Sequence, residues 1–128
     1  MSLTNSFETS VLTWLLTTGT PSPVRPTAGY LGLFTAAPGE AGGGTEISGN
    51  AYARQSFSFT VSGDTASNSA AIEFPAATGS WGTITHVAVF DAVTTGNMIA
   101  YATLTASKVI DTGDVLRVPS GDLDITLN

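Results

Sequence analysis

The chain has 128 residues, enough for one domain with a sizeable core, and it has no cysteine, which excludes disulfides and thiolate metal sites. Ten acids against four bases give a formal net charge of −6 without a basic cluster, so binding to nucleic acid or to an anionic membrane is disfavoured. Only 11% of the residues are charged while 42% are hydrophobic, which indicates a surface that other proteins cover.

The N-terminal segment, residues 1–19, is predicted to be helical. Asn5 and Glu8 have the spacing of a capping box, and Gly19 followed by prolines ends the helix. The apolar run is too short to span a bilayer, and no signal peptide is expected. One apolar stripe at helical spacing must be buried, either on the same domain or on a partner, and it is the first candidate interface: Phe7, Val11, Trp14 and Leu15.

Short strands are predicted along the rest of the chain, separated by clusters of Gly, Asp, Asn, Ser and Pro. They are Tyr30–Thr35, Tyr52–Val61, Ala70–Phe74, Gly82–Phe90, Asn97–Thr105, Val115–Val118 and Leu123–Leu127. This pattern favours a mainly β fold, an antiparallel β-sandwich or barrel-like domain of about seven strands with one short N-terminal helix. No linker calls for a second domain, so residues 1–128 are predicted to form a single β-domain.

Residues 36–50 are rich in glycine, alanine and small polar residues, and they cannot build a core of their own. We expect an extended loop or arm that contacts a partner or ligand; a loop without such a role fits the composition equally well. Four residues of this segment form the second candidate interface: Gly42, Gly43, Gly44 and Ile47. The three glycines do not form a phosphate loop, because neither a Lys-Ser/Thr pair nor a helix follows them.

His86 is the one histidine of the chain, and Asp91 follows five residues later. Side chains five apart in a regular strand point to opposite faces, so the two do not form a catalytic pair within that strand. Asp91 is expected to accept hydrogen bonds from backbone N–H groups of the turn 91–96. Without a G-x-S-x-G motif either, no catalytic residue is predicted.

The same region is expected to form a hairpin of Gly82–Phe90 and Asn97–Thr105. Its first strand is predicted to be covered on both sides because both of its faces carry apolar residues. The expected faces are Ile84, His86, Ala88 and Phe90 on one side and Val87 and Val89 on the other.

Two pairs of acids, Asp111 with Asp114 and Asp122 with Asp124, lie in or near turns. Neither matches a calcium-binding loop, and turn acids or a solvated strand face account for both. No metal or cofactor is predicted.

Trp81 is interpreted as a core residue at the start of a strand, with stacking on a sugar ring as the less favoured alternative. For Arg54 three positions stay open: burial against a carboxylate, the open surface, or an ion pair in an interface.

Three stretches together resemble a group of small virion proteins of tailed phages and prophages that are often labelled tail fibre proteins. Their most specific parts are Gly49–Arg54 (GNAYAR), Phe74–His86 (FPAATGSWGTITH) and Phe90–Asn97 (FDAVTTGN). The resemblance covers most of the chain, carries no catalytic residue with it, and implies a structural role in the phage particle. Head-decorating cement proteins, compact β-domains with an extended arm, share these features.

The sequence therefore predicts a non-enzymatic virion protein that is assembled in the host cytoplasm. The leading hypothesis is a decoration (cement) protein that binds the major capsid protein or other virion proteins as a homo-oligomer, with a trimer suggested by capsid symmetry. The alternative is a tail-fibre or tail-tip component that contacts host glycans. A nucleic-acid or membrane partner is not expected.

Overall fold

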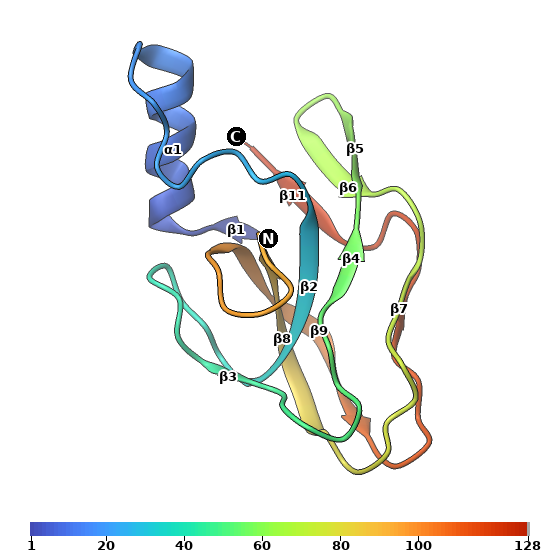
Figure 1. Ribbon diagram of the computed structural model, residues 1–128. Helices are drawn as coiled ribbons and strands as arrows, with labels where there is room; N and C mark the ends of the chain where they lie inside the picture. Colours follow the sequence, from blue (N-terminus) through green and yellow to red (C-terminus); the bar gives the residue numbers. More distant parts are fainter. Residues whose placement is uncertain (128) are drawn as a thin grey trace.

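A computed structural model describes residues 1–127 (Figure 1). The elements in chain order are β1 (Ser2–Leu3), α1 (Asn5–Leu16), β2 (Gly29–Ala36), β3 (Thr45–Glu46), β4 (Gln55–Phe57), β5 (Phe59–Ser62), β6 (Thr65–Asn68), β7 (Ile72–Glu73), β8 (Gly82–Phe90), β9 (Met98–Ile110), β10 (Arg117–Val118) and β11 (Asp124–Thr126). The chain is mainly β with one N-terminal helix among the described residues, as predicted, although the strands outnumber the seven expected.

All strand pairs are antiparallel. The largest sheet has the order β1-β9-β8-β2-β3, and β4 also pairs with β2; β10–β7 and β11–β6–β5 form two small sheets. The strand expected over Tyr52–Val61 is divided, because β4 pairs with β2 whereas β5 pairs with β6. At the break, Ser58 leaves the ladder and its carbonyl accepts the N–H of Ser69 at 2.9 Å. The chain thereby passes from the large sheet to a small one.

The main core lies between the large sheet and the small sheets. Leu31, Leu33 and Val89 project into it from the centre of the large sheet. Phe74, which follows β7 of a small sheet, meets them there, and Trp81, directly before β8, packs edge-on against Phe74 in the same core. A second, smaller cluster on the other face of the large sheet contains Phe34, Ala88 and Phe90. The two central strands β2 and β8 are therefore covered on both faces, which was predicted for Gly82–Phe90.

The hairpin of β8 and β9 is confirmed, with one correction to its faces. Ile84 packs with Val87 in the main core and does not share a face with His86. The reason is a change of register: Ile84 pairs with Lys108, but His86 pairs with Thr103. Such a bulge reverses the alternation of side chains locally, and the sequence pattern does not show where it occurs.

The helix begins one residue earlier than the expected capping box requires. Thr4 is the N-cap, and its carbonyl accepts the N–H groups of Phe7 and Glu8 at 3.0 Å. The Thr4 hydroxyl donates to the carbonyl of Met98 at 2.6 Å, and the Asn5 N–H donates to the carbonyl of Glu40 at 3.1 Å. The Asn5–Glu8 capping box is therefore wrong, since tertiary partners satisfy the first turn of the helix instead.

The turn after β8 is held by Asp91, as predicted. Its carboxylate accepts the backbone N–H of Asn97 at 2.7 Å and the side-chain N–H of the same residue at 2.9 Å. Gly96 adopts a φ of 73°, and a Cβ there would lie 2.5 Å from an Asp91 oxygen. The conformation of the turn therefore requires the glycine of the TGN sequence.

Candidate interaction surfaces

The polar residues that suggest chemistry serve local structure. His86 shares a 2.7 Å hydrogen bond with the hydroxyl of Thr85, and Asp91 belongs to its own turn. Asp114 accepts the N–H of Asp111 at 2.9 Å, as expected of turn acids. Within residues 1–127, His, Asp and Glu nowhere gather in threes that could hold a metal ion.

Trp81 belongs to the core. It is 4% exposed, lies edge-on to Tyr52 at 5.5 Å between ring centroids, and donates its Nε1–H to the carbonyl of Asn50 at 2.9 Å. The core interpretation is confirmed, and the sugar-stacking alternative for this residue is wrong because the ring has no free face.

Two of the three distinctive motifs contact each other. The carbonyl of Asn50 also accepts the N–H of Thr78 at 3.1 Å, and its side-chain amide donates to the carbonyl of Ser80 at 3.1 Å. A Cβ at Gly79 would lie 2.8 Å from the Asn50 side chain. Asn50 and Ala51 both have positive φ, 54° and 68°, which turns the chain so that Tyr52 enters the core. These motifs therefore build the fold.

Arg54 is buried against a carboxylate, one of the three positions left open by the sequence. Its side chain is 8% exposed and forms a two-pronged ion pair with Glu46, through Nε at 2.7 Å and Nη2 at 2.8 Å. Nη1 donates to the carbonyls of Ala92 at 2.9 Å and Thr95 at 2.8 Å. The guanidinium carbon lies 3.4 Å from the ring centroid of Phe90. One cation thus joins the β3 region to the turn after β8.

Sequence reasoning missed the role of Glu46 in this network. The signal that could have indicated it is Gly32, a glycine inside an otherwise apolar strand, which often marks a close approach. A Cβ at Gly32 would lie 2.8 Å from a Glu46 carboxylate oxygen and 3.2 Å from the Phe90 ring. Glycine at this position therefore makes room for the ion pair.

Tyr52 completes the network. Its hydroxyl donates to Glu46 at 2.7 Å and accepts the N–H of Leu33 at 3.0 Å. Burial raises the pKa of the Tyr52 hydroxyl above its ordinary value of 10.0, and the hydrogen bond to the Glu46 carboxylate raises that pKa further.

This raised pKa predicts a loss of stability in alkali. The neutral phenol is favoured in the folded state, so its contribution is fully present below the unfolded-state pKa of 10.0 and is lost as the pH rises toward the folded-state value. We expect Tyr52 to ionise only together with unfolding, measured as tyrosinate absorbance and circular dichroism between about pH 9 and pH 12. In Tyr52→Phe the absorbance step at unfolding should shrink. Ionisation of all three tyrosines of the natural chain with the fold intact would contradict the prediction.

The glycine-rich arm is a folded hairpin. Gly39 and Gly42 exchange two backbone hydrogen bonds of 2.9 Å, and Glu40 at the tip accepts the hydroxyl of Tyr101 at 2.5 Å. A Cβ at Gly44 would lie 2.7 Å from the carbonyl oxygen of Ala36, whereas one at Gly42 would meet nothing within 4 Å. Gly44 therefore closes the hairpin, and the Gly42 position faces open space.

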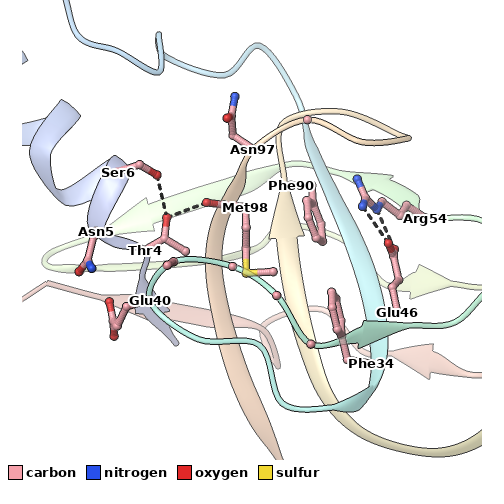
Figure 2. Close-up of a pocket in the computed structure, with 15 residues that line it drawn as sticks. Thr4, Asn5, Ser6, Phe34, Glu40, Glu46, Arg54, Phe90, Asn97 and Met98 are labelled. Atoms are coloured by element: carbon pink, nitrogen blue, oxygen red, sulfur yellow. Dashed lines mark hydrogen bonds and ion pairs between the residues drawn. The ribbon is translucent and has the colours of Figure 1, made fainter.

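Under this hairpin lies the pocket of Figure 2, about 690 Å³ in volume. The stacked rings of Phe34 and Phe90, with centroids 6.1 Å apart, and the Met98 side chain form its apolar part. The arm glycines and the first helical residues, Asn5 and Ser6, form the rim. Both rings are buried and the Arg54 guanidinium is engaged by Glu46 and by backbone carbonyls, so the side chains of Asn5, Ser6 and Asn97 are among the exposed polar groups of the lining.

The structure divides the candidate interface residues into two groups. Phe7 is 5% exposed and Ile47 belongs to the main core, so both side chains are largely buried within their own domain. The other helical members, Val11, Trp14 and Leu15, are exposed. The helix thus uses one turn to anchor itself on its own domain and leaves the rest of its apolar residues uncovered.

A family of known proteins matches nearly the whole chain. The family described as podophage GP4 fiber I protein gp80 matches residues 2–126. The chain belongs to this family. The match covers the N-terminal helix, the arm hairpin and all three distinctive motifs, so the resemblance to tailed-phage virion proteins is confirmed. Comparison with curated proteins gives no match.

Membership in the fiber I family supports a structural role in the phage virion. Between residues 1 and 127, no helix is long and apolar enough to cross a membrane.

Proposed function

We propose that this chain is a non-enzymatic structural component of a podophage fibre and that it acts by binding other virion proteins. The observation that carries this proposal is the family match over residues 2–126, whose description names a fibre protein. The way the chain uses its polar residues agrees with it: Arg54, Glu46 and Asp91 hold turns and strands together. Such residues contribute rigidity to a particle component.

A fibre component is favoured over the head-decoration hypothesis because of the family description alone. Both assignments require a rigid β-domain with an accessible binding surface. A decoration protein would bind the major capsid protein across the head lattice, and many weak contacts would add up there. A fibre component would bind a few copies of a tail or fibre protein. Location and copy number therefore distinguish them.

The test is to purify virions that carry this chain, quantify it against the major capsid protein by mass spectrometry, and locate it with gold-labelled antibody. We expect a small number of copies for each virion, with label on the fibres or tail. Hundreds of copies distributed over the head would contradict the fibre assignment and support decoration. Absence from purified virions would contradict both.

Host-glycan contact, the further possibility for a tail-tip component, receives no support from Trp81, whose ring is buried. An exposed aromatic ring does exist at Trp14, but the groove beside it is mostly apolar, and Arg25 is the one charged side chain in its lining. Binding to protein fits these surroundings better.

A further inference from the structure

The exposed apolar side chains of this molecule are concentrated at one corner. Among residues 1–127, seven of the eleven large hydrophobic side chains that are exposed lie on α1 or beside it, whereas the other four are spread over the β-domain. In Figure 1 the helix stands apart from the sheets, near the end of β11. We name the seven residues the helix corner: Val11, Leu12, Trp14, Leu15, Leu16, Val24 and Leu127.

The helix corner is too large and too apolar for a free surface. Trp14 is 66% exposed and Leu16 is 71% exposed, and residues 9–24 contain no charged side chain. At roughly 100 Å² for each of the seven side chains, the corner exposes about 700 Å² of apolar residues, more than the 300–600 Å² of the largest patch on a typical monomer. That area is close to the roughly 800 Å² that each partner contributes to a standard interface.

The corner has two parts, a ridge and a groove. Leu15 and Leu16 lie three and four residues after Leu12, so the three leucines are neighbours on the helix surface and form a ridge. Beside the ridge lies a groove of about 370 Å³ between the helix and the proline-rich segment that follows it. The groove is lined by Phe7, Ser10, Val11, Trp14, Pro21, Pro23, Arg25, Pro26 and Leu127. The Ser10 hydroxyl holds this segment in place through a 2.8 Å hydrogen bond to the carbonyl of Pro23.

We propose that the helix corner is the interface between copies of this chain, with the ridge of one copy packed into the groove of the next. A ridge and a groove side by side on one molecule allow identical subunits to close a small ring, because each copy supplies both halves of the contact. A different protein would need both a groove that accepts the ridge and a ridge that fills the groove. The inference does not depend on whether the protein stands on a fibre or on the head.

The charges at the corner fit a second copy as well. Glu8 lies one helical turn before Leu12, at the end of the ridge, and Arg25 lies at the rim of the groove. Neither forms an ion pair among residues 1–127. When a ridge occupies the groove of a neighbour, an acid and a base meet at the edge of the apolar contact. Opposite charges at such a rim favour this pairing, although each copy carries a net charge of −6.

The first test measures the mass of the full-length protein by sedimentation equilibrium. We expect the natural chain to exceed its monomer mass of 13.0 kDa at micromolar concentration, as a dimer or trimer. Leu15→Glu places a charge on the ridge and should raise the dissociation constant about 100-fold, without loss of the circular dichroism of the fold. Val61→Glu, at an apolar position on β5 that is exposed to a similar degree, is the matched control and should leave the mass unchanged.

A natural chain that stays monomeric up to about 100 μM would overturn the proposal and leave the corner to another virion protein. An oligomer that Leu15→Glu leaves intact would overturn it as well.

A second measurement does not depend on weakening the contact. The chain has no cysteine, so one introduced thiol gives an unambiguous cross-link. Leu16→Cys should form a covalent dimer rapidly on mild oxidation, whereas Val61→Cys at the same concentration should form at least tenfold less. Equal cross-linking at the two positions would contradict the assignment of the interface to the helix corner.

Discussion

Replacing Arg54 with alanine is expected to lower the free energy of unfolding by about 3–5 kcal/mol, because it leaves the Glu46 carboxylate without its cation in a largely buried site. The guanidinium makes four hydrogen bonds and lies on the face of Phe90, so packing is lost together with charge. The carbonyls of Ala92 and Thr95 also lose their donor. Urea unfolding followed by circular dichroism measures the change.

The other ion pair of the described residues provides the control. Arg117 and Glu73 are 4.0 Å apart and more than half exposed, so Arg117→Ala should change stability by less than about 1 kcal/mol. Removing both partners of the buried pair, as in Arg54→Met with Glu46→Leu, should cost less than Arg54→Ala alone, because no uncompensated charge remains. Equal losses in Arg54→Ala and Arg117→Ala would contradict this role of the buried network.

The second large effect is expected for Trp81→Ala, which should also lower the free energy of unfolding by about 3–5 kcal/mol. The indole fills the centre of the main core, edge-on to Tyr52 and to Phe74, and its removal leaves a cavity. The carbonyl of Asn50 loses the Nε1–H donor that holds the Gly49–Arg54 motif against the Trp81 motif. Thermal and urea unfolding measure the loss.

Two variants separate the causes of that loss. Trp81→Phe keeps most of the volume but not the N–H donor, so it should cost less than Trp81→Ala. Trp14→Ala, the same truncation at an exposed position of the helix, should leave the unfolding of the isolated subunit nearly unchanged. Similar losses of unfolding free energy in Trp14→Ala and Trp81→Ala would contradict the assignment of Trp81 to the core and of Trp14 to the surface.

Much of the fold followed from local patterns. The N-terminal helix, the hairpin around residues 91–97 and the last strands were predicted because apolar periodicity and turn residues are local properties. The extra strands were not, since β1, β3 and β6 are two to four residues long and exist only because a neighbour supplies their hydrogen bonds. The capping residue was missed for the same reason: Thr4 is fixed by the carbonyl of Met98, 94 residues away.

The candidate site was predicted only in part. Val11, Trp14 and Leu15 were selected as an apolar stripe, and they are accessible, but so are Leu12 and Leu16, which were not part of that stripe. A stripe shows which residues avoid water and does not show what covers them. Ile47, chosen with the arm, lies in the core because its N–H bonds to the carbonyl of Leu33 and draws the chain inward.

Patterns in the sequence were enough to predict the β class, the place of the helix and the role of Asp91, and the motifs indicated the phage virion family. The first three depend on residues close together in the chain, and the family is recognised from a combination of residue identities. The folded molecule was needed to show that Arg54 pairs with Glu46, that the Trp81 ring is closed to ligands and that Ile84 packs in the main core. Each of these depends on contacts between segments far apart in the sequence, and the hydrogen bonds and excluded volume that select them exist only after the sheets have paired.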